Sequence, residues 1–404
     1  MTTEQTPQRP SGTIPVLSAE AWPGLATGIR SRFIENVNGL RMHVLEAGHE
    51  RADRPMLLLL HGFPELAYSW RKVMPLLAAA GYHVVAPDQR GYGLTTGWTA
   101  DYDGDLRPFR IMNIAKDALA LVSALGRESV HAVIGHDFGA SVAAWCALTR
   151  PDVFRRMVLM SAPFGGPPSL PFGTAADTQP AGSQRPAPGS DALSQTLQQL
   201  AKLPRPRKHY QWYYSERQAD RDMRECEQGL HAFMRAYYHY KSADWEGNTP
   251  YRLAGWAAEE LAKMPTYYIM DLDQDMAQSV APFMPSPERI ADCQWLPEQE
   301  LAVYTEAFSR TGFQGGLQWY RARTSGLNNE DCLMYSHCTI DVPACFIAGA
   351  SDWGVQQKPG DLETMRDKVC TQMKHCHLIP GAGHWVQQEQ AGETARLLID
   401  FLQR

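Results

Sequence analysis

"VIGHDFGASVAAW", residues Val133–Trp145, predicts a sharp turn between a buried strand and a helix. Its apolar beginning is typical of a strand, and residues 140–148 favour a helix. Gly135 and Gly139 have the spacing of the G-x-S-x-G turn, which holds a serine hydroxyl above a sheet. Asp137 takes the place of that serine. The stretch therefore predicts a turn built for a nucleophile, with a carboxylate in the nucleophile's position.

Strand and helix patterns alternate on both sides of this turn. Before it, strands are predicted by "RMHVLEAG", "PMLLLLHG" and "YHVVAPD", and helices by "SWRKVMPLLAAAG" and "IMNIAKDALALVSALG". After it, "RRMVLMSAP" predicts a further buried strand. Such alternation is typical of a mostly parallel sheet with helices on both faces, so we predict an α/β fold.

The alternation stops at Phe164. Residues 164–190 are dense in Pro, Gly and Ser and predict a long loop. From Asp191 to about His337 the patterns are helical, and none is a convincing strand. Alternation then returns from "VPACFIAGASD" to the C-terminus. We therefore expect an α/β core divided by a helical cap, with the core at residues 1–163 and 336–404 and the cap at residues 164–335.

Two more polar residues follow predicted strands at the carboxyl edge of the sheet, where open α/β sheets build their sites. Asp352 lies in "GASDW" and His384 in "GAGHW". The order Asp137, Asp352, His384 is that of nucleophile, acid and histidine in the α/β-hydrolase plan, with aspartate replacing serine. Each residue alone is explained as well by a turn or a helix cap. Together they predict a catalytic triad whose carboxylate attacks carbon and forms an ester.

The stretch "HGFPE", His61–Glu65, follows a predicted strand where such enzymes take one backbone N–H of an oxyanion hole. The second N–H comes from the residue after the nucleophile. We therefore assign the two donors to Phe63 and Phe138. A simple Gly-Pro turn is compatible with the same residues.

The motifs "HGFPE", "DQRGYG" (Asp88–Gly93), "GHDFGA" and "GAGHW" resemble those of epoxide hydrolases of the α/β-hydrolase superfamily. The resemblance extends over nearly the whole chain, apart from the first thirty residues and parts of the insertion. It implies an enzyme that opens an epoxide to a vicinal diol through an aspartyl ester, which a histidine-activated water hydrolyses. It also implies that no metal and no organic cofactor takes part.

The resemblance further implies two cap tyrosines that donate hydrogen bonds to the epoxide oxygen. "GGLQWYRAR" is similar to the segment of one of them, which carries over to Tyr320, and "KHYQWYYSE" to the other, at Tyr210. Tyr213, Tyr214 and Tyr240 are alternatives to Tyr210. Without the resemblance, most of these tyrosines would be assigned to the core of an aromatic-rich cap. The aromatic cap predicts a pocket for an apolar or aromatic small-molecule epoxide.

Two other functions are weighed against this one. Haloalkane and haloacid dehalogenases share the Asp–His–Asp triad, but a leaving halide needs donors such as an indole N–H. Haloalkane dehalogenases typically place Trp after the nucleophile, where Phe138 here offers no side-chain donor. A non-catalytic binding protein on the same fold is the third candidate, and the complete triad argues against it.

Composition excludes several classes of partner. The chain has 404 residues, 44% of them hydrophobic, and a net charge of −6, which argues against a nucleic-acid partner. We interpret the one basic run, Arg205–Lys208, as a solvated turn. The apolar stretches of the chain are too short to span a membrane, and the N-terminus lacks a secretory signal, so we expect a cytoplasmic protein. A homodimer is compatible with the sequence.

Eight cysteines are scattered along the chain, which favours free thiols, with Cys370 and Cys376 as the pair most open to a disulfide. His375 and His377 flank Cys376 and raise the question of a metal site. Because neighbouring side chains of a strand point to opposite faces, we assign them to packing instead.

Overall fold

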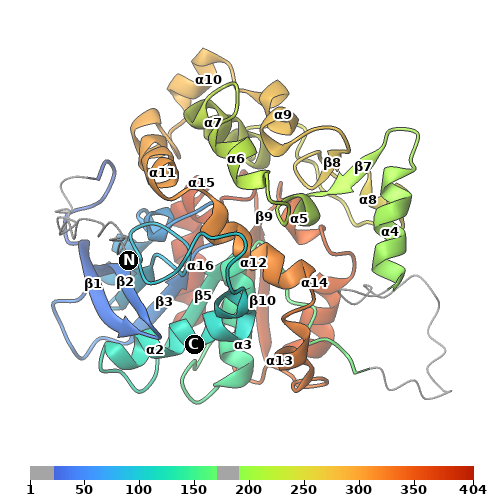
Figure 1. Cartoon of the computed structure of the whole chain (residues 1–404). Helices are drawn as coiled ribbons and strands as arrows, with labels where there is room; N and C mark the ends of the chain where they lie inside the picture. Colours follow the sequence, from blue (N-terminus) through green and yellow to red (C-terminus); the bar gives the residue numbers. More distant parts are fainter. Residues whose placement is uncertain (1–21, 171–190) are drawn as a thin grey trace, which may run out of the picture.

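The computed structural model describes residues 22–170 and 191–404, in which an eight-stranded sheet has the order β1-β2-β4-β3-β5-β6-β9-β10 (Figure 1). Strands β1, β2 and β4 pair antiparallel and all other neighbours pair parallel. The predicted α/β fold with a mostly parallel sheet is therefore confirmed. The strands are β1 (Arg30–Val37), β2 (Leu40–Ala47), β3 (Met56–Leu60), β4 (His83–Pro87), β5 (Ala132–His136), β6 (Met157–Met160), β9 (Ala344–Gly349) and β10 (Met373–Ile379).

Helices cover both faces of this sheet, which explains why its central strands are apolar throughout. In β3, Leu58 and Leu60 pack on the side of α2 and α3, whereas Leu57 and Leu59 pack on the side of α1 and α16. The helices of the core are α1 (Met74–Ala79), α2 (Ile111–Ala124), α3 (Phe138–Thr149), α14 (Asp361–Thr364), α15 (Val386–Glu389) and α16 (Ala391–Leu402).

The helix predicted over "SWRKVMPLLAAAG" is shorter in the structure. A 3₁₀ turn covers Ala67–Trp70, and α1 begins only at Met74. Pro75 lies in the first turn of α1, where its missing N–H costs no hydrogen bond. The same proline prevents one continuous helix from Ser69, since it could not donate to the preceding turn.

The chain between β6 and β9 is mainly helical, and much of it lies above the carboxyl edge of the sheet (Figure 1). The returning chain contacts the core: Asp331 forms an ion pair with Arg110 at 3.0 Å, and Asn328 accepts a hydrogen bond from the Ile111 N–H. The helices of this segment are α4 (Asp191–Ala201), α5 (Tyr210–Tyr213), α6 (Ala219–Arg224), α7 (Leu230–Lys241), α8 (Ala258–Leu261), α9 (Met276–Val280), α10 (Pro287–Asp292), α11 (Glu298–Thr311), α12 (Gln314–Thr324) and α13 (Asn329–Leu333).

The prediction of no strand in this segment is wrong. β7 (Arg207–His209) pairs antiparallel with β8 (Ile269–Asp271), about sixty residues later in the chain. Three residues are too few to show a strand's period in the sequence. The interpretation of Arg205–Lys208 as a solvated turn is also wrong. Arg207 is buried in β7 and forms an ion pair with Asp271 at 3.0 Å.

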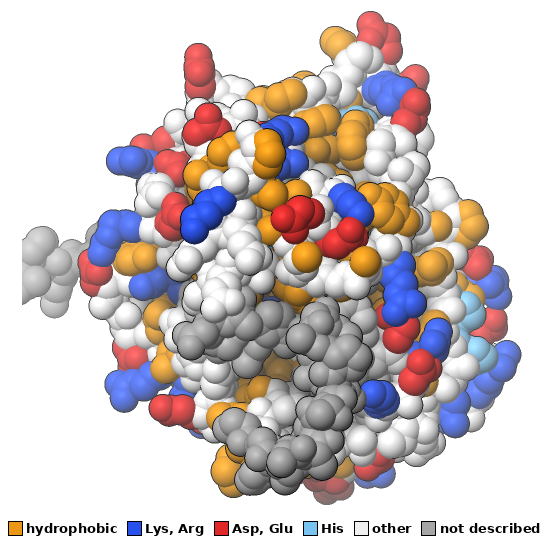
Figure 2. Space-filling model, turned by 90° about the vertical axis from the view of Figure 1, so that its right-hand side faces the viewer, with side chains coloured by type: hydrophobic (Ala, Val, Ile, Leu, Met, Phe, Trp, Pro, Cys, Tyr) orange, Lys and Arg blue, Asp and Glu red, His pale blue; other side chains and the backbone are white. Residues whose placement is uncertain are grey.

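Other predictions concern the loop, the thiols and the surface. Residues 164–170 form neither helix nor strand, and the remainder of the predicted loop, 171–190, lies outside the described residues. All eight cysteines lie within the described residues and are free. In the described parts of the chain, no group of three metal-ligating side chains occurs and no helix could cross a membrane. On the face shown in Figure 2, acidic and basic side chains are interspersed, and neither sign forms a continuous area.

Candidate active site

Asp137 stands at the turn between β5 and α3 with φ 52° and ψ −117°, a conformation that costs energy for any residue except glycine. The flanking glycines make this turn sterically feasible. A side chain on Gly135 would collide with the backbone of Gly139, and one on Gly139 would collide with the backbone of Leu60. The strained turn thus holds the carboxylate above the end of the strand.

The predicted oxyanion loop lies directly against this carboxylate. The Phe63 N–H donates a hydrogen bond of 3.0 Å to Oδ1 of Asp137. A side chain on Gly62 would collide with Asp137, which explains the glycine before Phe63. Phe138 begins α3, so its N–H belongs to the first turn, whose amides have no partner within the helix. Both amides predicted for the oxyanion hole therefore adjoin Asp137.

His384 lies between the two aspartates. Its Nδ1–H donates to Oδ1 of Asp352 at 3.1 Å, and its Nε2 lies 3.5 Å from Oδ2 of Asp137. Asp352 also accepts the Gly354 N–H at 2.6 Å, which fixes the carboxylate at the start of a 3₁₀ turn. With Nδ1 held by Asp352, Nε2 is the imidazole nitrogen that faces the reaction centre.

Burial and charge oppose one another at these carboxylates. Burial raises the pKa of Asp137, but contact with His384 and the charge of Lys241 outweigh it and hold that pKa below its usual range. Burial likewise raises the pKa of Asp352, and the charge and hydrogen bond of His384 lower it further than burial raises it. Asp137 is therefore ionised over the whole physiological range, which is the state that the predicted role of nucleophile requires.

A buried ion pair of His136 and Glu65 contacts the backbone of His384. His136 Nδ1 lies 2.6 Å from Oε2 of Glu65, and its Nε2–H donates to the backbone carbonyl of His384 at 2.7 Å. Gln387 donates to the other Glu65 oxygen at 2.8 Å. Burial lowers the pKa of His136, but the Glu65 charge overcomes this and raises it. Neither His136 nor Glu65 was predicted as a site residue, although His136 lies in "GHDFGA" and Glu65 in "HGFPE".

The backbone around His384 is held by residues that sequence patterns gave no reason to single out. The His384 N–H donates to the carbonyl of Lys241, the last residue of α7, at 2.9 Å. Glu389 accepts the N–H of Gly383 and of Trp385, each at 2.9 Å, and also an N–H of the segment that follows α7. Cap and histidine loop are thus joined on both sides of the imidazole.

Tyr320 and Tyr210, the two predicted cap acids, belong to one aromatic cluster that contacts Phe63 and Phe138. The Tyr320 ring lies 5.2 Å from the Phe138 ring and 5.5 Å from the Phe63 ring, and Tyr210 is its neighbour at 6.0 Å. Burial and then the charge of Asp137 raise the pKa of Tyr320 well above its usual range, so its hydroxyl remains a donor. The Tyr210 hydroxyl donates to Gln357 at 2.9 Å, a contact that the sequence did not predict.

The alternative tyrosines have other partners. Tyr213 donates to Asp222 at 3.2 Å, and the Tyr240 hydroxyl lies 3.1 Å from that of Thr266. Tyr214 donates to Tyr237 at 3.3 Å, while its ring adjoins that of Tyr320 at 5.1 Å. Among these, only Tyr214 belongs to the aromatic cluster around Tyr320, so the geometry favours Tyr210 over Tyr213 and Tyr240.

The position of Tyr320 depends on a close approach between core and cap. Gly315 in α12 and Gly91 in the Asp88–Gly93 loop touch so closely that a side chain on either would collide with the backbone of the other. Trp319 adds a hydrogen bond of 2.9 Å from its indole to the Arg90 carbonyl. The "DQRGYG" motif therefore positions α12, the helix that carries Tyr320, through this backbone contact and this hydrogen bond.

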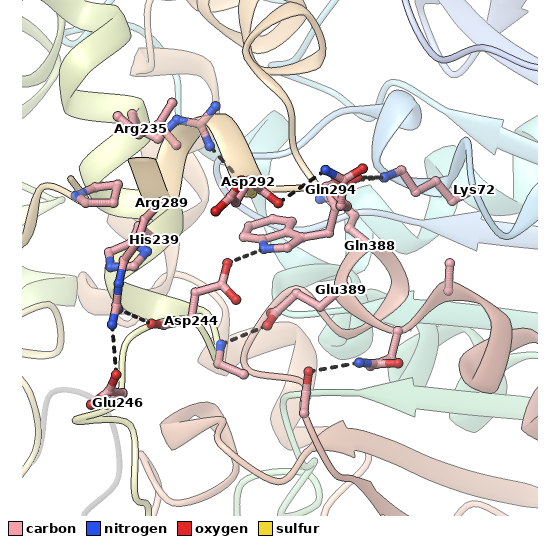
Figure 3. Close-up of a pocket in the computed structure, with 18 of the residues that line it drawn as sticks. Lys72, Arg235, His239, Asp244, Glu246, Arg289, Asp292, Gln294, Gln388 and Glu389 are labelled. Atoms are coloured by element: carbon pink, nitrogen blue, oxygen red, sulfur yellow. Dashed lines mark hydrogen bonds and ion pairs between the residues drawn. The ribbon is translucent and has the colours of Figure 1, made fainter. Parts of the chain in front are cut away.

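A separate pocket of about 790 Å³ opens at the junction of core and cap (Figure 3). Most of its polar walls are paired: Trp295 donates to Asp244 at 2.7 Å, and Arg289 to Glu246 at 2.8 Å. None of the predicted site residues lines it, although Glu389 does. This pocket is thus distinct from the group around Asp137.

Comparisons with known proteins agree with this geometry. The family described as alpha/beta hydrolase fold matches residues 55–391. Epoxide hydrolase A of Mycobacterium tuberculosis is 31% identical to this chain over 386 residues, which cover 93% of the chain and 98% of that protein. Epoxide hydrolase 3 of Siraitia grosvenorii is 27% identical and covers 91% of the chain and 97% of that protein.

Solved structures give the same result. Epoxide hydrolase A from Mycobacterium thermoresistibile superposes with a TM-score of 0.69 at 31% identity, covering 93% of this chain and 98% of that one. An epoxide hydrolase from an endophytic Streptomyces gives a TM-score of 0.69 at 28% identity, covering 94% of this chain and 96% of that one. The chain therefore belongs to the alpha/beta hydrolase fold family and, within it, to the epoxide hydrolases.

Proposed function

We propose that this enzyme converts an epoxide to a vicinal diol through an ester of Asp137. The observation that carries the proposal is the setting of that carboxylate. Its Oδ1 accepts the Phe63 N–H, its Oδ2 faces Nε2 of His384 at 3.5 Å, and the ring of Tyr320 stands over the loop that holds it. Oδ2 is consequently the oxygen free to attack.

In the first step, Tyr320 and Tyr210 hold the epoxide oxygen by hydrogen bonds while Oδ2 of Asp137 attacks a ring carbon. The C–O bond of the ring breaks, and a tyrosine proton passes to the oxygen that leaves. Tyr210 exchanges its contact with Gln357 for the epoxide oxygen in this step. The product of the step is an ester of Asp137 with the ring-opened alcohol.

In the second step, Nε2 of His384 removes a proton from water, and the resulting hydroxide attacks the ester carbonyl. Asp352 stabilises the imidazolium through Nδ1, at 3.1 Å. The amides of Phe63 and Phe138 hold the charge that develops on Oδ1. The tetrahedral intermediate then collapses, and the departing diol oxygen takes the proton from Nε2 of the imidazolium. The proton of the Asp137 carboxylic acid returns to the tyrosinate, which restores the carboxylate, the neutral histidine and both tyrosines.

The geometry favours this reaction over halide release. Trp319 and Trp385 have rings that adjoin the site, at 5.1 Å from the Phe138 ring and 4.7 Å from the His384 ring. Both donate their indole N–H to backbone carbonyls, so neither offers it to a leaving halide. Tyrosine hydroxyls, by contrast, supply the proton that an alkoxide needs.

We further propose that residues 164–335 act as the cap that carries these acids, and that residues 1–163 and 336–404 act as the hydrolytic core. The supporting observation is that Tyr210 and Tyr320 come from α5 and α12, whereas Asp137, Asp352 and His384 follow strands of the sheet.

A single turnover in oxygen-18 water, with enzyme in excess over an aryl epoxide such as styrene oxide, tests the mechanism. Since the new diol oxygen comes from Oδ2 of Asp137, the first diol should be unlabelled and the label should appear in a peptide that contains Asp137. A diol labelled at once would mean direct attack by water. A parallel assay with halogenated alkanes and acids would reveal a dehalogenase instead.

A further inference from the structure

Lys241 is a buried cation beside the site that the proposed reaction does not use. It ends α7, is 3% exposed, and its carbonyl receives the His384 N–H. Its side chain extends among four aromatic rings. The Lys241 Nζ lies 5.0 to 5.7 Å from their centroids, which belong to Tyr237, Tyr267, Tyr268 and Trp385. These rings attract the ammonium through their faces but carry no net charge to neutralise it.

No hydrogen bond and no ion pair joins this ammonium to any residue of the described chain. A buried charge without a counter-ion is costly, so the arrangement calls for a reason. Burial lowers the pKa of Lys241 below its usual range, and the charges of Asp137, Asp352 and Glu65 offset this only in part. The geometric link between Lys241 and the site is Trp385, whose ring lies 5.4 Å from Nζ of Lys241 and 4.7 Å from the His384 ring.

A second polar group in the same cluster lacks a partner. The hydroxyl of Tyr268 is buried and makes no hydrogen bond, although Tyr268 is only 1% exposed. Its ring lies 5.1 Å from that of Tyr210, one of the two proposed acids. Tyr267, in contrast, donates to Asn248 at 2.7 Å. The ammonium of Lys241 and the hydroxyl of Tyr268 are thus two donors without acceptors, in a cluster that adjoins Tyr210.

We propose that Lys241 and Tyr268 recognise an anionic group of the substrate, so that the enzyme takes epoxides that carry a carboxylate near the ring. The inference rests on the proposed epoxide opening at Asp137. The ionised carboxylates of Asp137 and Asp352 would repel such a substrate. Lys241 is the positive charge on the cap side that offsets this repulsion, and its aromatic cage holds it in place when no substrate is bound.

The test compares two substrates of the same shape, trans-3-phenylglycidate and its neutral amide, trans-3-phenylglycidamide. Wild type should open the acid at least as efficiently as the amide, despite the negative charge of the nucleophile. In Lys241→Met, kcat/KM for the acid should fall relative to the amide by about 10- to 100-fold, the range expected for a lost hydrogen bond to a charged group. Tyr268→Phe should lower the same ratio by about tenfold or more, because its hydroxyl also bonds the charged carboxylate.

Two matched variants separate recognition from general disruption. Lys241→Arg keeps the charge and should retain most of the preference. Lys208→Met removes the cap lysine whose Nζ lies 5.0 Å from the Tyr213 ring, outside the site, and should leave the ratio of acid to amide unchanged. Equal losses on both substrates in Lys241→Met would overturn the proposal, as would a wild type that opens the amide but not the acid.

A measurement on wild type alone covers the case in which Lys241→Met does not fold. trans-Cinnamate and trans-cinnamamide have the same carbon skeleton without the oxirane. As competitive inhibitors of styrene oxide opening, the anion should bind about tenfold or more tightly than the amide. Equal or weaker inhibition by cinnamate would overturn the proposal. If wild type opens no epoxide at all, the proposed function itself fails, and this inference fails with it.

Discussion

The two sides of the site are built differently. On the sheet side, Asp137, Asp352 and His384 each follow a strand of the core, and backbone hydrogen bonds fix the turns that carry them. On the cap side, Tyr210 and Tyr320 sit on helices whose positions depend on packing between segments far apart in the sequence. Geometry set by a local turn tolerates little adjustment, whereas packed helices shift slightly at small cost. Changes on the sheet side should therefore abolish turnover, and changes on the cap side should give graded losses.

Removal of the nucleophile should have the largest effect. Asp137→Ala should lower turnover by roughly 10⁴- to 10⁶-fold, the range seen when a covalent nucleophile is removed. The matched control is Asp103→Ala, which removes an exposed carboxylate paired with Arg217, and it should turn over normally. Substantial activity in Asp137→Ala, measured as diol formation, would mean that another group attacks the ring.

Loss of the base should stop the cycle halfway. His384→Gln should still form the ester of Asp137 but should not hydrolyse it, because Nε2 of His384 is the base that faces Oδ2 of Asp137, at 3.5 Å. Intact-protein mass spectrometry should then show one substrate added per chain. His375→Gln, a histidine of β10 away from the site, should show no adduct and normal turnover. Diol release by His384→Gln at the wild-type rate would point to a different base.

The cap acids should show partial redundancy. Since two donors share one oxygen, Tyr210→Phe and Tyr320→Phe should each cost less than the 10²- to 10³-fold typical of a lost oxyanion donor. The double variant should lose nearly all epoxide opening, measured by single-turnover alkylation, while its melting temperature stays close to that of wild type. Tyr240→Phe is the matched control, because its hydroxyl bonds Thr266. A double variant with most of its activity would shift the role to Tyr214.

The same contrast explains what the sequence could predict. The turn at Asp137 is encoded by glycines two residues away on each side, so a short motif was sufficient to predict it. Asp352 and His384 follow apolar runs long enough to show as strands. The carboxyl ends of parallel strands meet at one edge, and hence the three side chains were expected together before any distance was known.

The remainder depends on contacts between distant segments. β7 and β8 are three residues each and pair across some sixty residues, which leaves no periodic signal in either. Lys241 and Glu389 looked like ordinary charged residues, and only the folded chain places them around the loop of His384. The contact of Tyr210 with Gln357 joins cap and core over 147 positions of the sequence. No local pattern encodes such a pair.

The contact between Gly91 of the core and Gly315 of the cap tests whether changes on the cap side give graded losses. Gly315→Ala would force α12 away from Gly91, so the Tyr320 hydroxyl should move and turnover should fall by about tenfold. Overpacking of this kind costs about 1–3 kcal/mol of unfolding free energy. The control is Gly392→Ala in α16, where an added side chain meets nothing within 4 Å. Unchanged turnover in Gly315→Ala would show that the position of the Tyr320 hydroxyl does not depend on the contact between Gly315 and Gly91.

The smallest expected effect concerns Asp88, in the Asp88–Gly93 loop that contacts α12. Asp88 is buried and accepts hydrogen bonds from the N–H groups of Ala67 and Leu94, each at 2.9 Å, and from His43 at 2.8 Å. Burial raises the pKa of Asp88, but the charge and hydrogen bond of His43 lead the effects that lower it to about 2. Because this pKa is depressed in the folded state, the ionised carboxylate stabilises the fold above the ordinary aspartate pKa. That stabilisation disappears as the pH falls toward 2.

Urea denaturation at pH 5 and pH 3 measures this contribution. Wild type should lose about 1 kcal/mol of unfolding free energy over that interval from Asp88 alone. Asp88→Asn has no charge to titrate there, so its loss between the two pH values should be smaller than that of wild type by this amount. The variant should also be less stable at pH 5, since the amide cannot accept all three hydrogen bonds as strongly. If the two proteins lose the same free energy between pH 5 and pH 3, the charge of Asp88 does not stabilise the loop that contacts α12. That loop would then be held by its backbone contacts, like the turns on the sheet side.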